Sequence, residues 1–438
     1  MKKVLLLDFQ ADLSSPIRKA VTGTFGSQTE IDGLIGKMYK KKKAQGLIIP
    51  PLFFAYASGI FKQENWEIKH SYKFPTSEYD LIILATSMPG YQAELNAAKT
   101  YKEKYPQVPI IAAGAFSKEK PELFENILDA VIVDGEPELS FIKLAKNEYQ
   151  FPLANKRIEN GQVEKPDELP FPHWEVFNFQ DFKYAPMLKG ISVPVLTSRG
   201  CPYNCDYCHY MPEAGPNIRY REVDNVIAEL KYLKSIGVEN IVFRDLVFTL
   251  NKKRTIELCD KMIEEKLNLT WAIETRIDRL KEDLIDKMYE AGLRHLNLGI
   301  ESPDPAILKS VGRLPANLVH QENIVKYIQN KGLTVSAFYI LGFVQDNDET
   351  INNTINYAKK LNTLAAQFCI MTPFPGTKLY DTLKGRLSTE DWTRYTEYHS
   401  VVKLDHLSAK QIEKYRDIAY RKYYLRPSWM LKYWKRLI

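Results

Sequence analysis

The chain has 438 residues, and at roughly 100–200 residues per domain this length predicts two to four domains and excludes a single small binding module. Hydrophobic residues make up 45% and charged residues 26% of the chain, which is typical of a folded protein and excludes a disordered or collagen-like one. Residues 410–438 contain nine Lys and Arg against two Asp and Glu, so a net charge of +7 is concentrated at the C-terminus. We therefore expect no nucleic-acid-binding surface over the molecule as a whole.

The cysteines and the N-terminus indicate a cytoplasmic protein. Three of the five cysteines fall within eight residues, which is not how a secreted disulfide framework is built. The apolar run at residues 4–7 ends at Asp8 and is too short for a signal peptide. The uncharged stretch at residues 44–61 is interrupted by Pro50 and Pro51, and the remaining helix of about three turns is too short to span a bilayer.

Short apolar runs alternate with helical patterns over residues 1–150. Strands are expected at residues 3–8, 66–72, 80–86, 108–113 and 129–133, and helices at 52–63, 92–105, 121–127 and 137–146. Buried runs separated by amphipathic helices predict an α/β fold with a doubly wound, Rossmann-like parallel sheet. Such sheets bind ligands at the carboxyl ends of their strands, where this chain carries Asp8, Ser87, Gly114, Gly135 and Glu136.

A proline-rich segment at residues 151–190 shows little periodicity and is expected to link this domain to the next. A second α/β series follows, with strands expected at 193–198, 240–244, 269–275, 295–300, 334–340 and 365–371. Six βα units within residues 191–385 predict a partial (β/α)6 barrel of the TIM type rather than the closed barrel of eight units. Residues 386–438 are expected to form a small helical extension.

The most specific motif consists of Cys201, Cys205 and Cys208, with Tyr207 directly before the third cysteine. Thiolates this close can reach one iron–sulfur cluster, and three ligands would leave one iron of a four-iron cluster open to a small chelating molecule. The alternative is a zinc site that includes His209, although the adjacent Cys208 and His209 would have difficulty sharing one tetrahedral ion. Either Cys259 or Cys369 is an alternative fourth ligand, but we expect both to be buried free cysteines.

The spacing Cys-x3-Cys-x2-Cys, with an aromatic residue before the third cysteine, resembles the signature of the radical S-adenosylmethionine (SAM) superfamily. The resemblance implies that Cys201, Cys205 and Cys208 bind a [4Fe–4S] cluster and that Tyr207 lies near the adenine of SAM. It also implies that the reduced cluster cleaves SAM to a 5′-deoxyadenosyl radical, with electrons from an external donor such as flavodoxin or ferredoxin.

Polar residues and a glycine follow the expected barrel strands, which is where a barrel builds its site. They are Asp245, Glu274, Arg276, Glu301 and Gly342. By resemblance, these positions match the family's contacts to the amine, ribose and carboxylate of SAM. Carboxylates suit an ammonium group or ribose hydroxyls, and Arg276 suits a carboxylate. A surface salt bridge or a helix cap is the alternative for each residue alone, and Asp245 departs from the Gly-Gly-Glu form common in the superfamily.

Nearly the whole chain resembles the cobalamin-binding branch of this superfamily. The resemblance is carried by the doubly wound domain, the linker at 169–172, the cysteine motif, and residues 372–377 and 424–427. It implies that Ser87, Gly114, Gly135 and Glu136 contact cobalamin. The motif that supplies a histidine below the cobalt is missing, and His70 is the only histidine before residue 173, so we expect that face to be water-bound or empty. A domain that has kept the fold and lost the cofactor is the alternative.

Together these resemblances predict a radical SAM enzyme that, with cobalamin, methylates a carbon centre of a small-molecule, lipid or natural-product substrate. The alternative is a radical SAM cyclase or oxidoreductase that acts on a lipid, isoprenoid or tetrapyrrole-like substrate without methyl transfer. A tRNA methylthiotransferase is disfavoured because residues 1–150 contain no cysteine for a second cluster. A non-enzymatic cobalamin or redox sensor is a further alternative.

The basic C-terminal extension carries seven Tyr and Trp residues between its cations: Tyr415, Tyr420, Tyr423, Tyr424, Trp429, Tyr433 and Trp434. We expect this segment to pack its aromatic side chains on the barrel. The alternatives are that it lies on the anionic inner membrane surface, which would bring the enzyme to a lipid substrate, or that it binds a nucleic-acid or protein partner.

Overall fold

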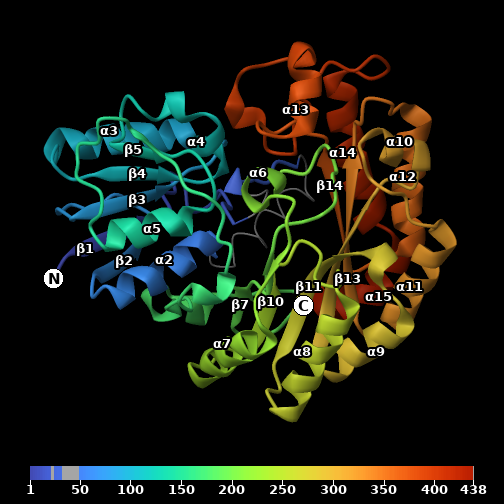
Figure 1. Cartoon of the computed structure of the whole chain (residues 1–438). Coiled ribbons are helices and arrows are strands. Elements are labelled where there is room, and N and C mark those ends of the chain that lie inside the picture. The colour runs from blue at the N-terminus through green and yellow to red at the C-terminus, as the bar shows by residue number, and fades with distance from the viewer. Residues whose placement is uncertain (21–23, 32–48, 438) are drawn as a thin grey trace.

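Two parallel sheets of six strands each form the framework of the molecule (Figure 1). A two-stranded hairpin is inserted in the chain between the first and second strands of the C-terminal sheet. The structure is a computed structural model that describes residues 1–20, 24–31 and 49–437. Of the uncharged stretch at 44–61, residues 44–48 lie outside the described part. Within that part, no helix has the length and apolar character that a bilayer span requires.

The N-terminal sheet has the strand order β2-β1-β3-β4-β5-β6. The strands are β1 (Lys3–Leu7), β2 (Glu67–Ser71), β3 (Leu81–Ala85), β4 (Ile110–Ala113), β5 (Ala130–Ile132) and β6 (Arg157–Ile158). The order reverses between β1 and β3, which is the point where open α/β sheets bind ligands. Strand β6 comes from the segment expected to be a linker, so that segment contributes the edge of the sheet.

Helices cover both faces of this sheet, as predicted. Alternate side chains of β1 point to opposite faces, so Val4 and Leu6 join one hydrophobic cluster and Leu5 and Leu7 another. In Figure 1, α2 (Leu52–Gln63) and α5 (Pro137–Ala145) lie below the sheet, and α3 (Tyr91–Lys104) and α4 (Ala115–Glu119) lie above it.

The prediction of a helix at residues 121–127 is wrong. A short 3-10 turn, Pro121–Leu123, takes its place after α4. The reason is the next strand, because the amide of Asp129 already donates a hydrogen bond to the carbonyl of Ile110 (3.0 Å) and leaves little chain for a longer helix.

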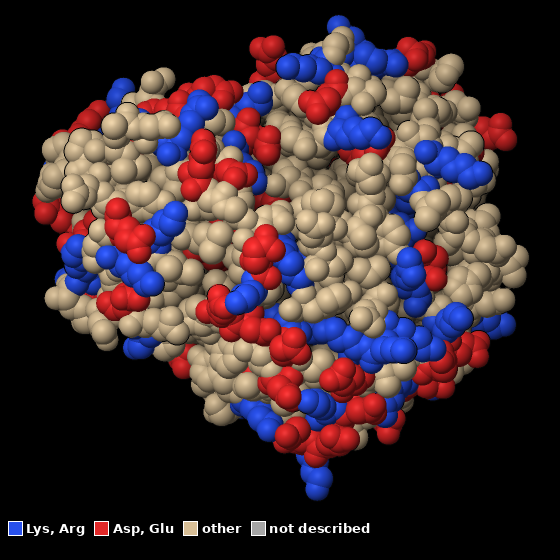
Figure 2. Space-filling model, in the orientation of Figure 1, with Lys and Arg blue, Asp and Glu red and all other residues tan. Residues whose placement is uncertain are grey.

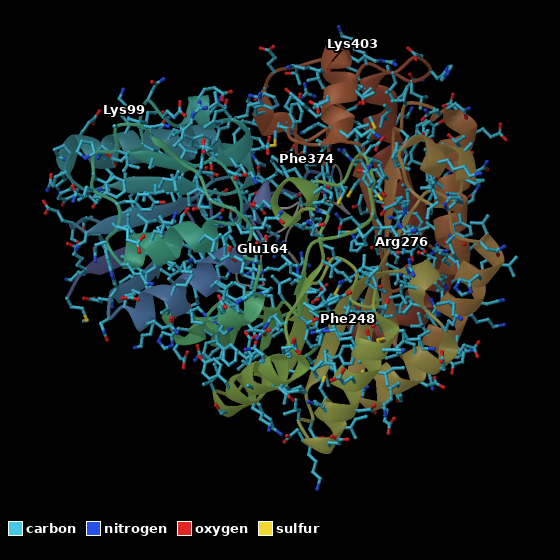
Figure 3. The ribbon with its side chains drawn as sticks, viewed as in Figure 1. Lys99, Glu164, Phe248, Arg276, Phe374 and Lys403 are labelled. Carbon is cyan, nitrogen blue, oxygen red and sulfur yellow. The ribbon has the colours of Figure 1, made fainter. Side chains whose placement is uncertain are left out.

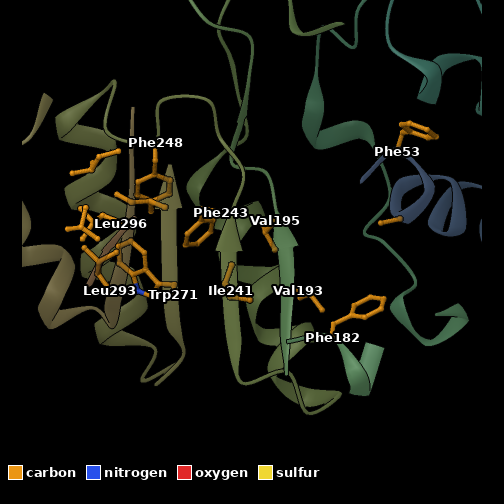
Figure 4. Packing of buried hydrophobic residues seen from close by; sticks show 14 of the residues in the cluster. Phe53, Phe182, Val193, Val195, Ile241, Phe243, Phe248, Trp271, Leu293 and Leu296 are labelled. Atoms are coloured by element: carbon orange, nitrogen blue, oxygen red, sulfur yellow. The ribbon is translucent and has the colours of Figure 1, made fainter. Parts of the chain in front are cut away.

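The second sheet is the predicted partial barrel of six parallel strands, with the order β14-β13-β12-β11-β10-β7. Its strands are β7 (Ser192–Val195), β10 (Asn240–Phe243), β11 (Thr270–Arg276), β12 (Leu293–Glu301), β13 (Thr334–Leu341) and β14 (Ala365–Ile370). The outer helices are α7 (Val223–Ser235), α8 (Lys252–Glu264), α9 (Glu282–Glu290), α10 (Pro305–Ser310), α11 (Leu318–Asn330) and α12 (Asp348–Leu361). Figure 4 shows Phe243, Phe248 and Trp271 packed together, and Phe182 of the linker beside Val193 of β7.

The C-terminal segment contains α13 (Lys378–Leu383), α14 (Ala409–Tyr424) and α15 (Pro427–Leu437). Four of the tail's aromatic residues are buried: Tyr420, Tyr423, Trp429 and Tyr433. Three of them donate hydrogen bonds to the chain just before β14: Tyr423 OH (2.6 Å) and Trp429 Nε1 (3.1 Å) to the carbonyl of Thr363, and Tyr433 OH to that of Asn362 (2.8 Å). The prediction that the tail aromatics pack on the barrel is confirmed for these four; the side chain of Trp434 lies outside the described part.

Aromatic contacts join the two halves of the molecule. Phe374, which follows β14, lies 5.0 Å from Phe25 of the N-terminal domain between ring centroids, and Figure 3 shows it between the two halves. Trp392 lies 6.1 Å from Phe116 of α4. These contacts hold the carboxyl ends of both sheets around one cavity.

Candidate active site

A cavity of about 1920 Å³ lies between the two sheets and is lined from both. A pocket for a single drug-sized ligand usually measures about 300–1,000 Å³, so this cavity has room for more than one molecule. Its wall on the N-terminal side includes Arg18, Ala20, Thr24, Ser27, Ile49, Pro50, Leu52, Phe53, Glu136 and Glu138. Its wall on the barrel side includes Arg244, Glu274, Arg276, Asn297, Glu301, Arg313, Phe338 and Ile340.

The three cysteines of the motif line this cavity from one loop. The loop connects β8 (Ser198–Arg199) to β9 (Arg219–Tyr220), which pair as a short antiparallel hairpin. Gly200 begins the loop with a φ of +89°, and a Cβ there would lie 2.0 Å from the carbonyl oxygen of Asn217, so only glycine fits. The amide of Cys201 donates to the carbonyl of Gly215 (3.0 Å), which closes the loop.

Burial disfavours the thiolate form of two of these cysteines. Burial raises the pKa of Cys208 to about 12, and it also raises the pKa of Cys201. Positive iron would reverse this preference, because metal ligation requires the thiolate. In the described part of the chain, no three His, Cys, Asp or Glu side chains are close enough to bind one metal ion. A four-iron cluster does not require the three thiolates to converge on one ion, because each thiolate binds its own iron atom. Three soft sulfur donors around one cavity therefore fit such a cluster.

The other candidate ligands of the cluster lie in different places. Cys259 is buried in α8 and is not part of the cavity wall that the described residues form. Cys369 lies on that wall, on β14, and its sulfur is 3.7 Å from a carboxylate oxygen of Glu397. His209 also lines the cavity, and burial lowers its pKa to about 3, so the ring is neutral.

Three of the predicted SAM contacts line the cavity at the barrel strand ends, namely Glu274, Arg276 and Glu301. Arg244 and Glu274 form an ion pair across neighbouring strands. The guanidinium of Arg276 lies 4.3 Å from the ring centroid of Tyr203 and donates to Asp278 (2.9 Å). Figure 3 shows Arg276 on the barrel side of the molecule.

Glu301 ends β12 in an unusual backbone conformation, with a φ of +63°. Non-glycine residues adopt this region at a cost of about 1–3 kcal/mol, and such strain is common at functional sites. Burial raises the pKa of Glu301, while Arg313, 3.6 Å away, acts in the opposite direction. Arg313 also donates to Tyr207 OH (3.3 Å), so one cation links this carboxylate to the cysteine loop.

Tyr207, predicted to lie near the adenine of SAM, also lines the cavity, whereas the predicted contacts Asp245 and Gly342 are not part of the cavity wall as the described residues outline it. The buried carboxylate of Asp245 accepts hydrogen bonds from the Thr197 amide (3.0 Å), the Thr197 hydroxyl (2.8 Å) and the Ser198 hydroxyl. It therefore holds the hairpin that carries the cysteine loop. The amide of Gly342 donates to Asp346 (2.8 Å) in the turn after β13.

Of the four predicted cobalamin contacts, Glu136 lines the cavity and Ser87, Gly114 and Gly135 are not among its described lining residues. The hydroxyl of Ser87 donates to Glu94 (2.6 Å). Gly135 has a φ of +63°, and a Cβ there would lie 2.0 Å from the carbonyl oxygen of Gly161, so this glycine is required by the neighbouring chain. Gly114 leads from β4 into α4.

Glu136 connects the N-terminal domain to the cysteine hairpin. It accepts hydrogen bonds from Arg199 of β8 (2.9 Å) and from Arg219 of β9, and Glu138 accepts a second one from Arg199 (2.8 Å). Burial opposes ionisation, but the two arginines hold the pKa of Glu136 below its usual value. The hairpin is thus clamped from the N-terminal side by Glu136 and Glu138 and from the barrel side by Asp245.

A buried cation occupies the point where the strand order of the N-terminal sheet reverses. The ammonium of Lys19 is fully buried and lies 3.3 Å from Asp8 and 3.0 Å from Glu94. It also donates to the carbonyl of Ala85 at the end of β3 (2.6 Å). Asp8, a predicted ligand contact, is therefore paired within its own domain.

Sequence reasoning did not identify Arg313, Tyr203, Arg199, Arg219 or Lys19. Arg313 and Tyr203 do not follow a barrel strand directly, and Lys19 lies in a region without periodicity. Arg199 and Arg219 do flank the cysteine loop, but their position in the sequence does not show which carboxylate they pair with. The two members of the Arg199–Glu136 pair are 63 residues apart in the chain.

A family model described as the radical SAM superfamily matches residues 195–358. A protein of Pyrococcus horikoshii named uncharacterized methyltransferase PH0819 is 33% identical over 427 residues, which cover 89% of this chain and 91% of the relative. The chain belongs to the radical SAM superfamily. The anaerobic magnesium-protoporphyrin IX monomethyl ester cyclase of Rubrivivax gelatinosus is 24% identical over 420 residues, covering 87% of this chain and 75% of the cyclase.

A solved structure extends the fold comparison to this radical SAM enzyme's N-terminal domain. The radical SAM methyltransferase TsrM of Kitasatospora setae, solved with cobalamin and a [4Fe–4S] cluster, superimposes with a TM-score of 0.61. The match covers 89% of this chain and 76% of TsrM at 14% identity. The predicted arrangement, a doubly wound domain followed by a partial barrel, is therefore confirmed as a known fold. Membership of the superfamily also implies SAM, a [4Fe–4S] cluster and an electron donor.

Proposed function

We propose that this radical SAM enzyme binds a [4Fe–4S] cluster through Cys201, Cys205 and Cys208 and, with cobalamin, methylates a carbon centre of a small-molecule or lipid substrate. The observation that carries the proposal is the shared cavity. It is lined on one side by the three cysteines and the barrel strand ends, and on the other by the N-terminal domain. Two large cofactors and a substrate can meet there.

When bound, the reduced cluster supplies the electron that cleaves SAM to a 5′-deoxyadenosyl radical, and cobalamin carries the methyl group. The chain's own part is placement. Arg276 and Arg313 bring positive charge to the cysteine loop, and both lower the pKa of Cys201 against the raising effect of burial. Their positions suit the carboxylate of SAM, while Glu274 and Glu301 suit its ammonium group and ribose hydroxyls.

The wall available to cobalamin differs from the one predicted from the sequence. Ile49, Pro50, Leu52 and Phe53 offer an apolar surface of the kind that a flat macrocycle would cover. His70, the only histidine before residue 173, lies on β2 outside the described wall of the cavity, with its ring 5.0 Å from that of Phe177. We therefore propose that cobalamin binds without a histidine below the cobalt.

The interior of the barrel indicates an apolar substrate with a polar group. Val242, Phe338 and Ile340 line the inner wall, while Asn297 supplies a hydrogen-bonding group. Asn297 already donates to Tyr184 OH (2.7 Å), and burial raises the pKa of Tyr184 to about 12, so this hydroxyl keeps its proton at neutral pH.

A cyclase or oxidoreductase is the second candidate function. The observation that favours it is the similarity to the Rubrivivax gelatinosus cyclase, which extends over 87% of this chain. The same cavity and the same cysteine loop would serve a radical reaction without methyl transfer.

Product analysis separates the two candidates. Anaerobically reconstituted enzyme should be incubated with a reductant, SAM labelled in its methyl group, cobalamin and a metabolite extract. Methyl transfer predicts one 5′-deoxyadenosine and one S-adenosylhomocysteine for each labelled product. If 5′-deoxyadenosine forms with no S-adenosylhomocysteine and no labelled product, the methyltransferase proposal is wrong and the cyclase or oxidoreductase proposal replaces it.

A further inference from the structure

Apolar side chains gather on the outer surface of the C-terminal helices. Leu425, Met430 and Leu431 are 60%, 50% and 76% exposed, although the same segment buries Trp429 and Tyr433 against the barrel. Large hydrophobic residues this exposed are few in the described part of the chain, and three of them fall within residues 425–431. Exposed apolar side chains that gather in one place mark a contact surface, whereas single ones need no explanation.

Cations surround this surface. The C-terminal segment carries the chain's excess positive charge, and Lys422 and Lys432 are exposed beside the apolar residues. Lys432 donates to the side chain of Gln329 at the end of α11 (2.8 Å). Figure 2 shows that Lys and Arg side chains also form a band across the lower part of the face in view, with Asp and Glu side chains below it.

The cavity of the candidate active site reaches this surface. Its lining includes Leu425, Trp429 and Met430 together with the three cysteines. It also includes Thr270 and Arg276, the first and last residues of β11, so the cavity follows the full length of that strand. At about 3.3 Å per residue, this length is about 20 Å.

We propose that the surface formed by Leu425, Met430 and Leu431 with its surrounding cations, the barrel-base surface, lies on an anionic phospholipid bilayer. The apolar side chains enter the boundary between headgroups and acyl chains, and the Lys and Arg side chains contact the phosphates. The cavity then opens toward the bilayer, so molecules dissolved in the membrane reach the barrel interior directly. This last consequence rests on the proposed function and narrows its substrate class to lipid-soluble molecules.

Vesicle flotation of the full-length protein tests the proposal. The probes are vesicles of phosphatidylcholine alone and of phosphatidylcholine with an equal amount of phosphatidylglycerol. Wild-type protein should float with the anionic vesicles, and salt should weaken the binding because it screens the charges. The double variant Leu425→Ser/Leu431→Ser should bind at least about tenfold more weakly, because it loses two exposed apolar side chains that would enter the bilayer.

The matched control is Leu13→Ser/Val319→Ser, which removes side chains that are 49% and 66% exposed elsewhere. Val319 lies in the first turn of α11, at the opposite end from Gln329. The control should float like the wild type, and both variants should keep the far-ultraviolet circular dichroism and the unfolding temperature of the wild type, which shows that they are folded. Absence of flotation with anionic vesicles, an equal loss in both variants, or retention of a mixed-sequence RNA in place of vesicles would overturn the proposal. A wild-type protein that floats but cleaves no SAM would instead count against the proposed function.

Discussion

The two parallel sheets carry polar residues at the same kind of position, the carboxyl ends of their strands, but they use them differently. At the barrel, Glu274, Arg276 and Glu301 line the cavity. In the N-terminal domain, Asp8 and Ser87 are paired with Lys19 and Glu94 inside their own domain. Identical placement in a fold therefore does not give identical function.

The difference comes from where the basic partner of each acidic side chain lies. Lys19 brings a buried ammonium group to the end of β1, and Asp8 and Glu94 are both paired with it inside their own domain. At the barrel, Arg313 lies 3.6 Å from Glu301 but both remain on the cavity wall. A strand-end carboxylate is free for a ligand only where its own domain leaves it facing the solvent or the cavity.

The largest effect is expected on the barrel side. The triple change of Cys201, Cys205 and Cys208 to Ala should abolish iron–sulfur absorption and all SAM cleavage, because no cluster can then form. Iron content and 5′-deoxyadenosine are the measurements. The single changes Cys259→Ala and Cys369→Ala are the controls and should keep their iron; loss of iron in either would mean a fourth protein ligand.

On the N-terminal side, Lys19→Met should lower the free energy of unfolding rather than the rate of SAM cleavage. It leaves Asp8 and Glu94 buried without a cation, and removing one partner of a buried ion pair costs about 3–5 kcal/mol. Urea unfolding at neutral pH measures this loss. A loss well below 1 kcal/mol would show that the two carboxyls do not depend on Lys19.

The same variant has a pH dependence with a definite sign. Burial raises the pKa of Asp8 and of Glu94 in the folded protein, and Lys19 opposes that rise. Without Lys19 the folded state binds more protons than the unfolded state, so stability falls as the pH rises through the raised values. The deficit of Lys19→Met relative to wild type should therefore shrink as the pH is lowered toward 5, and a deficit that grows would contradict this account.

A smaller effect is expected where the two domains meet. Glu136→Gln replaces a charged acceptor of Arg199 and Arg219, and such hydrogen bonds contribute about 1.5–3 kcal/mol. The variant should keep its iron but lose free energy of unfolding by about that amount. Glu125→Gln, which weakens the more exposed pair with Arg157, is the control and should have a smaller effect. Equal losses in the two variants would mean that the Glu136 clamp contributes no more to stability than an exposed ion pair.

The smallest effect is expected for Ser87, which was predicted to contact cobalamin but lies outside the described cavity wall. Ser87→Ala removes a hydrogen bond to Glu94, which is expected to lower stability by about 0.5–1.5 kcal/mol. Because Ser87 is not part of the described cavity wall, the affinity for cobalamin should stay within about twofold of wild type. A loss of tenfold or more in a cobalamin titration would show that Ser87 contacts the cofactor after all.

The sequence predicted features that depend on local patterns. The alternation of apolar runs and helices predicted both parallel sheets. The cysteine spacing predicted that three thiolates can reach one cluster, and the structure places all three cysteines on one cavity wall. Asp245 and Ser87 were placed correctly at strand ends, but the sequence does not show that Thr197 and Glu94 engage them. The clamp between Glu136 and Arg199 depends on the packing of segments far apart in the chain, which no local pattern reports.

The most direct test of the central claim, that one cavity brings cobalamin to the cysteine loop, is electron paramagnetic resonance of the enzyme reconstituted with cobalt(II) cobalamin. We predict one bound cobalamin per chain, in the base-off form and without nitrogen superhyperfine splitting, because His70 lies outside the described cavity wall. Nitrogen splitting in the spectrum, or protein that binds no cobalamin after reconstitution, would contradict it.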